Sequence, residues 1–250
     1  MRPTSFSIFF PMYNERANIE LLLAEVEMVI PTLGFDDYEI LFIDDGSTDG
    51  CDRLIEERAL TNGRIRLVRH PHNMGYGSAL RTGFLEASKE IVFYTDSDLP
   101  VQLTDIARAL PLLEEADVVI GYRVARYDTP RRAVYSWVYN RLIRLLFGVR
   151  VRDVNFSFKM VHRRALNCIT LDASTVFIDG QILAEAHRYG FTIAELPVVY
   201  IPRKFGRSNF DSLRTAWETF CELVGYWLRS HPRKEIAPIE AGSLPQAPRT

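Results

Sequence analysis

The chain has 250 residues, of which 47% are hydrophobic and 25% are charged, and these values are typical of a globular protein with one large core. A net charge of −2 argues against a dedicated nucleic-acid-binding protein, which needs a strongly basic face. The charge is uneven, because eight arginines accompany one acid, Asp128, between Arg123 and Arg152. That segment is a candidate anion-binding surface.

Cysteine content and apolar runs indicate the compartment. The three cysteines are far apart and odd in number, which is typical of a reduced, cytoplasmic protein. No charged-then-apolar leader opens the sequence, so we do not expect secretion. No run reaches the ~18 apolar residues that span a bilayer. We expect a cytoplasmic protein whose contact with a membrane, if any, is peripheral.

Apolar runs of strand length alternate with helical patterns as far as Gly121. The expected strands are Ser5 to Phe10, Tyr38 to Ile43, Ile65 to Arg69, Ile91 to Thr95 and Val118 to Ile120. The expected helices are Arg16 to Ile30, Thr48 to Leu60, Ser78 to Ala87, and Thr104 to Glu115 with a bend or break at Pro111. This alternation predicts an α/β fold with a mostly parallel sheet and right-handed crossovers.

The pattern changes after Gly121. We expect a loop over 122–130, an amphipathic helix over 131–147, a strand over 156–162, a helix over 178–189, strand segments over 192–200 and a last helix over 210–229. The domain organisation is then an α/β domain over 1–208, an amphipathic helix over 209–230 that associates with a membrane or with its own domain, and a disordered tail over 231–250.

Each early strand ends in a polar, turn-forming cluster. The clusters are Pro11-Met12-Tyr13-Asn14-Glu15, Asp44-Asp45-Gly46-Ser47, Asn73-Met74-Gly75-Tyr76-Gly77 and Asp96-Ser97-Asp98. Ligands of open α/β sheets bind beyond the carboxyl ends of the strands. The four clusters are therefore expected to meet at one edge.

Asp96 and Asp98 are the most informative pair. Two carboxylates at the end of a buried strand bind a hard divalent cation, with water and substrate phosphates as the other ligands. Asp-x-Asp alone is a weak signal, since an aspartate before a helix also serves as a cap. Its position after the apolar run Ile91 to Thr95 favours the metal site.

The pair Asp44 and Asp45 allows two interpretations. A glycine turn and a helix cap explain Gly46 and the hydroxyls that follow. They do not explain why two adjacent carboxylates occupy an edge that is already acidic. A hydrogen bond from a nucleobase N–H, or a nearby cation, would offset the repulsion between these carboxylates. Leu80 stands where a dinucleotide fingerprint needs its third glycine, and neither a P-loop nor a Gly-x-Ser-x-Gly elbow occurs.

In order and spacing, these clusters resemble the family 2 glycosyltransferases over roughly Ser5 to Arg207. The resemblance implies a GT-A fold, which is a Rossmann-like, mostly parallel sheet flanked by helices, here with a C-terminal amphipathic helix. The chain is most similar to the dolichyl- and polyprenyl-phosphate sugar synthases. That closer likeness rests on Gly121-Tyr122-Arg123, Arg132 to Asn140, Asp153 to Lys159, Phe177 to Gln181, Glu195-Leu196-Pro197 and Arg203 to Ser208.

The resemblance assigns roles to residues of this sequence. It implies a nucleoside pocket formed by Pro11, Tyr13, Asn14, Glu15, Asp44, Asp45, Asp96 and Ser97, in which Asp45 accepts a hydrogen bond from the base. It implies Mg²⁺ or Mn²⁺ and a diphosphate at Asp96 and Asp98. It implies donor or acceptor phosphates at Arg123, Arg132, Ser136, Asp179, Gln181, Arg203 and Lys204, with Arg123 and Arg203 also in the catalytic set. For Arg123, Arg132 and Arg203 a surface salt bridge is the competing interpretation.

Two departures from the family pattern concern the metal and the acceptor. Relatives often carry Gln or Ser two residues after the second aspartate, where this chain has Pro100, so Gln102 is the candidate third ligand. A neutral Gln181 occupies a position that is Glu in many relatives, which points to a different sugar or acceptor.

Three functions remain open from the sequence. The leading one is an inverting transferase that moves a sugar from GDP-mannose or a UDP-hexose to a polyprenyl or dolichyl phosphate at the cytoplasmic membrane face. The others are a family 2 enzyme that glycosylates a soluble or polysaccharide hydroxyl, with Asp153 or Asp179 as base, and a non-catalytic nucleotide-sugar-binding subunit. A lipid-phosphate acceptor needs no strong base, because its oxygen is already anionic. The partners expected are the nucleotide sugar, the lipid phosphate and a membrane surface or membrane partner.

Overall fold

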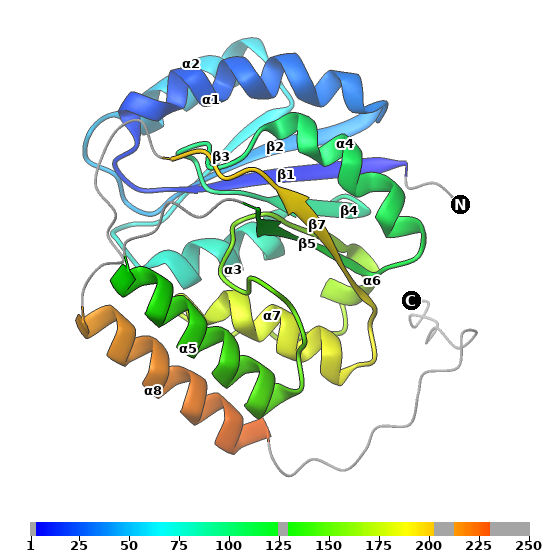
Figure 1. Cartoon of the computed structure of the whole chain (residues 1–250). Coiled ribbons are helices and arrows are strands. Elements are labelled where there is room, and N and C mark those ends of the chain that lie inside the picture. Colours follow the sequence, from blue (N-terminus) through cyan, green and yellow to red (C-terminus); the bar gives the residue numbers. More distant parts are fainter. Residues whose placement is uncertain (1–3, 125–129, 203–212, 231–250) are drawn as a thin grey trace, which may run out of the picture.

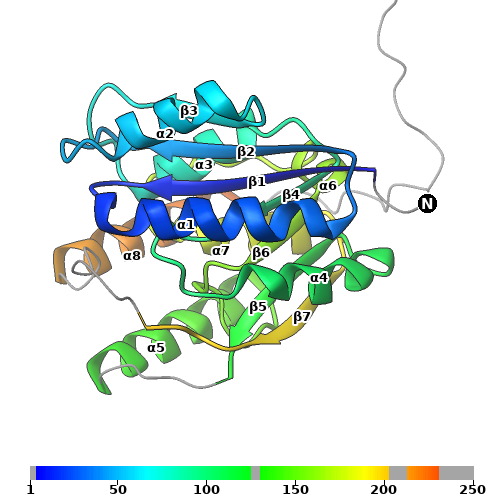
Figure 2. The same ribbon diagram turned by 90° about the horizontal axis from the view of Figure 1, so that it is seen from above.

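The computed structural model describes residues 4–124, 130–202 and 213–230, leaving the side chains of 130–132 and 213 undescribed. One seven-stranded sheet has the strand order β3-β2-β1-β4-β6-β5-β7. The strands are β1 (Ser5–Met12), β2 (Asp37–Asp44), β3 (Ile65–Arg69), β4 (Ile91–Tyr94), β5 (Val118–Arg123), β6 (Lys159–His162) and β7 (Ile193–Val198). They follow one another across the molecule from β3 to β7 (Figure 2).

The helices connect these strands. They are α1 (Arg16–Val29), α2 (Cys51–Thr61), α3 (Tyr76–Glu86), α4 (Ile106–Ala109), α5 (Pro130–Phe147), α6 (Arg163–Leu166), α7 (Phe177–Arg188) and α8 (Leu213–Ser230). Short 3-10 segments are η1 (Ile30–Leu33), η2 (Leu103–Asp105) and η3 (Leu110–Glu114). The helix expected over Thr104 to Glu115 is therefore three short segments, and Pro111 lies in the first turn of η3, where its missing N–H leaves no gap.

Alternating side chains of the central strands supply two cores. Phe6, Ile8 and Phe10 of β1 face the cluster that packs against α1, α2 and α4. Phe9 faces the second cluster, which includes residues of α3, α5, α7 and α8. Figure 1 shows α1 and α2 on one side of the sheet and α3, α5, α7 and α8 on the other. The near-continuous apolar strands of the sequence are thus strands covered on both faces.

All strand pairs are parallel except those of β6, which runs antiparallel between β4 and β5. The mostly parallel sheet predicted from the sequence is confirmed. The direction of β6 was not predicted, because an alternation of strands and helices along the sequence does not indicate that one strand runs antiparallel to its neighbours. In this register Lys159, the first residue of β6, lies opposite Tyr94, the last residue of β4.

The apolar stripe of α8 divides between its own domain and solvent. Leu223 and Tyr226 are buried against α7 and α5, with the Tyr226 ring 5.4 Å from that of Phe177. Trp217 is 65% exposed and stacks on Phe220. Along the described part of the chain, no helix is both long and apolar enough to cross a bilayer. The predicted tail after residue 230 and the proposed boundary at 208 lie outside the described residues.

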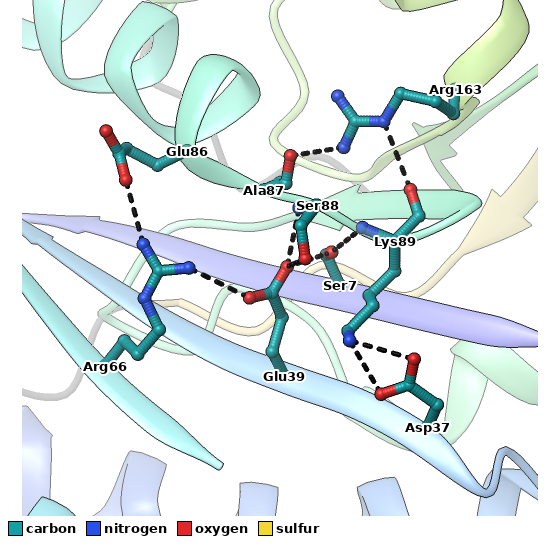
Figure 3. Close-up of polar contacts among 9 residues, drawn as sticks. All are labelled: Ser7, Asp37, Glu39, Arg66, Glu86, Ala87, Ser88, Lys89 and Arg163. Carbon is teal, nitrogen blue, oxygen red and sulfur yellow. Dashed lines mark hydrogen bonds and ion pairs between the residues drawn. The ribbon is translucent and has the colours of Figure 1, made fainter.

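The amino-terminal edge of the sheet is held by a buried carboxylate, Glu39 of β2 (Figure 3). Its Oε1 accepts hydrogen bonds from Ser7 Oγ at 2.7 Å and from the backbone and hydroxyl of Ser88. Its Oε2 accepts from Arg66 at 3.1 Å. Burial opposes ionisation of Glu39, but the hydrogen bonds from Ser7 and Ser88 and the charge of Arg66 outweigh burial and lower its pKa.

Replacing Glu39 by Gln is expected to lower the free energy of unfolding by about 2 kcal/mol at pH 7.5, because charged hydrogen bonds are lost in a buried place. A carboxylate whose folded pKa is lowered stabilises the fold above its unfolded pKa and loses that contribution as pH falls through the folded value. Urea unfolding should therefore show that the difference in the free energy of unfolding between the wild type and Glu39→Gln becomes smaller below about pH 4. Glu86→Gln, which removes only an exposed partner of Arg66, should change stability by less than about 0.5 kcal/mol. An undiminished Glu39 effect at acid pH would contradict this assignment.

Candidate functional site

The ends of β1 and β2 are joined through Asn14, one of the predicted nucleotide-binding residues. Asn14 has a positive φ of 55°, a conformation that Asn tolerates better than most residues. Its N–H donates to Ser47 Oγ at 2.9 Å, and its side-chain oxygen accepts from the Thr48 N–H at 2.8 Å. The Pro11–Glu15 and Asp44–Ser47 clusters therefore meet at one edge, as the sequence predicts.

Asp45 holds the third cluster against the other two. Its Oδ1 lies 2.7 Å from His70 Nδ1 and accepts from the Met74 N–H at 2.8 Å, while Oδ2 accepts from the Gly75 N–H at 2.9 Å. Most of the acceptor capacity of this carboxylate is thus used within the chain. The hydrogen bond predicted between Asp45 and a nucleobase stays a prediction. Because Oδ1 already has two partners, such a bond would have to use Oδ2.

Asp96 and Asp98 follow β4 and share one cavity. Burial and the neighbouring charge of Asp98 raise the pKa of Asp96 to about 7, against hydrogen bonds from Ser157 and Tyr76 that lower it. The hydroxyl of Tyr76 donates to Asp96 Oδ1 at 3.2 Å. Leu99, which follows the pair, has a positive φ of 56°, a strained conformation for a leucine that fixes the turn after the carboxylates.

The cavity has a volume of about 720 Å³ and extends from the carboxylate pair to two helices. Polar lining residues come from the start of α3, from the loop after β4 and from the loop before β6, and they include Tyr76, Asp96, Asp98 and Ser157. Helices α5 and α8 supply apolar lining residues, such as Val138 and Phe220, beside polar ones, such as Ser136 and Thr219.

Arg123, at the end of β5, is half of a buried ion pair that also lines the cavity. Its Nε donates to Asp153 Oδ2 at 2.7 Å and its Nη2 to Asp153 Oδ1 at 3.2 Å. This two-point contact fixes the plane of the guanidinium. The salt bridge considered for Arg123 is therefore present, but it does not lie on the surface, because the two side chains are only 12% and 1% exposed.

A buried lysine lies under the acidic end of the cavity. Lys159 Nζ donates to Asp179 Oδ1 at 2.6 Å, to the Phe156 carbonyl at 2.8 Å and to the Tyr94 hydroxyl at 3.2 Å. The Tyr94 hydroxyl in turn donates to Asp179 Oδ1. Asp179 Oδ2 is buried and has no hydrogen-bond partner among the described residues, and Asp179 lines the cavity. One of its oxygens is thus fixed and the other remains available to a ligand.

Apart from Gln102 and Gln181, the predicted site residues fall into three groups. Asp96, Asp98, Arg123, Ser136 and Asp179 line the cavity together. A neighbouring part of the sheet edge carries Pro11, Tyr13, Asn14, Glu15, Asp44, Asp45 and Ser97. The side chain of Arg132 is undescribed, and Arg203 and Lys204 lie outside the described residues.

Gln102 and Gln181 lie away from the cavity. Gln102 is exposed and is not among its described lining residues. Gln181 is fully buried, and its side-chain oxygen accepts from the Asp172 and Ala173 N–H groups. Gln181 therefore holds a turn of its own domain, and the predicted roles of these two residues stay predictions that this geometry does not favour.

Several site residues carried no usable signal in the sequence. Tyr76 lies within the third polar cluster and Lys159 within the segment Asp153 to Lys159, but the sequence assigns neither residue a role. Asn155 and Ser157 reach the cavity because β6 is antiparallel, so the residues before it lie beside the ends of β4 and β5. The direction of β6 depends on the tertiary structure, so the sequence pattern does not place Asn155 and Ser157 at the cavity.

The donor set fits a hard divalent cation. Asp96 and Asp98 are partly buried, and desolvation and the charge of Asp98 raise the pKa of Asp96, so a nearby cation would stabilise the pair. Oxygen is the donor that Mg²⁺ and Mn²⁺ prefer. Within the part of the chain that the structure describes, no group of three or more His, Cys, Asp or Glu side chains is placed to hold a metal. The chain would then supply Asp96 and Asp98, and water and phosphate oxygens would complete the coordination.

Comparison with known proteins identifies the family. The model of glycosyl transferase family 2 matches residues 7–170. This is well over half of the chain, which therefore belongs to that family, and the resemblance predicted from the sequence is confirmed.

Similar curated proteins include several transferases. Glycosyltransferase AglD of Haloferax volcanii is 30% identical over 92% of this chain, and the undecaprenyl-phosphate 4-deoxy-4-formamido-L-arabinose transferase of Klebsiella pneumoniae is 31% identical over 83%. The chain spans 38% and 63% of the length of these two relatives. Polyprenol monophosphomannose synthase of Mycolicibacterium smegmatis is 28% identical over 84% of this chain and 83% of its own length.

Solved structures share the fold. Glucosyl-3-phosphoglycerate synthase from Mycobacterium tuberculosis, in complex with Mn²⁺, UDP and glucosyl-3-phosphoglycerate, superposes with a TM-score of 0.69 at 21% identity, over 89% of this chain and 79% of that one. Mannosyltransferase PcManGT from Pyrobaculum calidifontis, in complex with GDP-Man and Mn²⁺, gives 0.60 at 21% identity, over 92% and 65%. The predicted GT-A fold class is confirmed.

Proposed function

We propose that this chain is an inverting, metal-dependent glycosyltransferase that moves a sugar from a nucleotide-diphosphate sugar to a polyprenyl phosphate. The observation that carries the proposal is the cavity that joins the carboxylate pair to apolar walls on α5 and α8. A single space thus offers charged groups for phosphates and apolar side chains for a hydrocarbon chain. Relatives named for undecaprenyl phosphate and polyprenol support the same acceptor class.

The donor is proposed to bind along the edge formed by β1, β2 and β4. Pro11, Tyr13, Asn14, Glu15, Asp44, Asp45 and Ser97 would surround the nucleoside, and Asp96 would lie at the diphosphate. Solved neighbours that contain UDP or GDP-Man support a donor of this class and leave GDP-mannose and a UDP-hexose as the candidates.

The acceptor is proposed to enter between α5 and α8. Val138 and Leu142 of α5 and Leu223 of α8 give the cavity an apolar lining that suits isoprene units. Arg123 would bind the acceptor phosphate, with Ser136 beside it on the wall of α5. Arg132, Arg203 and Lys204 are proposed to contact the same phosphates.

The mechanism follows from these groups. The acceptor phosphate is anionic at neutral pH, so the chain needs to orient it rather than to remove a proton. The guanidinium of Arg123, fixed by Asp153, would hold the acceptor oxygen opposite the leaving diphosphate, and attack from that side inverts the anomeric carbon. A cation bound by Asp96 and Asp98 would stabilise the charge that develops on the leaving group.

A hydroxyl acceptor is the second candidate, and Asp179 is the observation that favours it. A hydroxyl must lose a proton during attack, and Asp179 Oδ2 is a buried carboxylate oxygen in the cavity with no partner among the described residues. The two candidates differ in their need for this oxygen. A lipid-phosphate enzyme would use Asp179 to bind the sugar, whereas a hydroxyl-transferring enzyme would require it as base.

The protein is proposed to work at the cytoplasmic membrane face through exposed aromatic side chains. Trp137 of α5 is 68% exposed and Trp217 of α8 is 65% exposed, and both helices line the cavity. Such amphipathic residues favour the interface between water and lipid.

Asp98→Asn is expected to reduce turnover by at least about a thousandfold, because the cation and the leaving diphosphate lose a charged ligand. The assay supplies a nucleotide sugar, Mn²⁺ and either a polyprenyl phosphate or a soluble sugar, and measures release of nucleotide. We expect release only with the lipid phosphate. The melting temperature without metal should not fall in the variant, since a repelling charge beside Asp96 is removed. Turnover with the soluble sugar alone would establish the hydroxyl acceptor, and no release of nucleotide by the wild type with either acceptor would leave a binding subunit. Full activity of Asp98→Asn would contradict the cation site.

Val138→Asp tests the acceptor route. The substitution puts a charge into the apolar wall and should raise KM for a short-chain polyprenyl phosphate in detergent about tenfold, with KM for the nucleotide sugar unchanged. Leu145→Asp is the matched control, because Leu145 is exposed on the same helix and is not among the described lining residues. Equal effects of the two changes on acceptor KM would argue against this route.

Replacing Trp137 and Trp217 together by Ala is expected to weaken binding to vesicles of mixed neutral and anionic lipid about tenfold. Cosedimentation with the vesicles measures the bound fraction. Leu60→Ala, at an 88% exposed position on α2, is the control and should bind like the wild type. Unchanged sedimentation of the double variant would remove these two residues from the membrane contact.

A further inference from the structure

Glu222 of α8 accepts four hydrogen bonds from the turn that precedes α7. Its Oε1 accepts from the N–H and the hydroxyl of Ser174, at 2.8 and 3.0 Å. Its Oε2 accepts from the N–H of Thr175 at 3.0 Å and from the Thr175 hydroxyl. The structure uses Glu222 to fasten α8 to residues 174–175.

The same turn packs directly on the glycine segment at the start of α3. The Gly77 N–H donates to the Ser174 carbonyl at 3.1 Å. A Cβ added to Gly77 would lie 2.4 Å from the Ser174 carbonyl carbon, so only glycine allows this approach of two backbones. No flexible side chain lies between the two segments, and a shift of residues 174–175 must therefore move residues 75–77 or break the contact.

Tyr76, between the two glycines, carries the contact to the carboxylate pair. Its hydroxyl donates to Asp96 Oδ1, and the backbone on its other side is held by Asp45 through the Met74 and Gly75 N–H groups. The path from Glu222 to Asp96 thus consists of hydrogen bonds and one tight backbone contact. Asp45 restrains one end of the glycine segment, and Glu222, acting through residues 174–175, restrains the other.

We propose that Glu222 is a positioning residue for the transfer site: by holding residues 174–175 against Gly77, it sets the position of Tyr76 and of the Asp96 carboxylate. The role of Asp96 as a cation ligand rests on the proposed function. Because Thr219 and Leu223 line the cavity on the same helix, the wall that would meet the acceptor and the carboxylate that would meet the donor are linked through one side chain.

Glu222→Gln tests the proposal, because an amide keeps the shape but turns two N–H donors toward groups that are themselves donors. Glu218→Gln is the matched control: Glu218 lies one turn earlier on α8, is about half-exposed and pairs with Arg214. Ser174→Ala removes one of the four donated hydrogen bonds and should give an intermediate effect. Circular dichroism and thermal unfolding show whether each variant is folded.

The first readout is hydrogen exchange without metal or substrate. In Glu222→Gln the amides of residues 75–77 should exchange about tenfold faster than in the wild type, together with those of 174–177, whereas Glu218→Gln should not change them. Faster exchange confined to α8 and residues 174–177 would overturn the proposal, because the glycine segment would then be held independently. This measurement does not depend on catalysis, so it separates failure of the path from failure of the proposed function.

The second readout is binding of Mn²⁺ alone, followed through the electron paramagnetic resonance signal of the free ion. Displacement of Asp96 should raise the half-saturating Mn²⁺ concentration of Glu222→Gln by about threefold to tenfold, with Glu218→Gln unchanged. Equal Mn²⁺ binding by Glu222→Gln and the wild type would overturn the proposal. A loss of thermal stability without these two changes would mean that Glu222 only attaches α8.

Discussion

The site depends on how buried negative charge is accommodated at one edge of a sheet. Asp96, Asp98 and Asp179 line one cavity, and in a place of low dielectric their charges cannot simply be tolerated. Lys159, itself fully buried, neutralises Asp179, and Tyr94 and the Phe156 carbonyl complete its hydrogen bonds. Hydrogen bonds from Ser157 and Tyr76 offset part of the cost of burial and of repulsion by Asp98, but the pKa of Asp96 is still raised to about 7. A bound cation would remove that remaining cost, and this is the physical basis of the proposed cation site.

Parallel strands bring the parts of this edge together, and loop-to-loop hydrogen bonds then fix their spacing. Asn14 ties the end of β1 to that of β2, and Asp45 ties β2 to the segment after β3. Tyr76 continues the series to the end of β4. Each connection uses a side chain that also carries, or adjoins, a predicted ligand contact. The edge therefore acts as one unit, in which a change at one strand end reaches its neighbours through short, directional bonds.

Much of the fold could be predicted from the sequence, because local pattern determines it. Continuous apolar runs such as Ile91 to Tyr94 are strands covered on both faces, and the polar clusters after them gather at one edge as the parallel arrangement requires. The family assignment also followed from the order of those clusters. The carboxylate pair could be predicted because it follows a buried strand, whereas Arg123 was implied by the resemblance to the family.

The remainder could not be predicted, since it depends on tertiary contacts between distant residues. Lys159 meets Asp179 only because β6 runs antiparallel beside β4, and no periodicity reports that direction. Gln181 was expected at the acceptor, but it lies two residues after Asp179 on α7 and therefore on another side of the helix, where it holds Asp172 and Ala173. The amphipathic pattern of the last helix likewise cannot reveal that Glu222 contacts residues 174–175.

The antiparallel strand β6 brings a second kind of segment to the site. The proposed nucleoside half is built from crossover units whose loops must also start the next helix, so their sequences serve two purposes. Residues 153–158 only lead into β6, yet they supply Asp153, Asn155 and Ser157 to the cavity region. Val154, Phe156 and Phe158 of this stretch are buried in the core, whereas Asn155 and Ser157 between them line the cavity. Substitutions at these two alternate positions would therefore reshape the cavity while the core and the parallel framework stay unchanged.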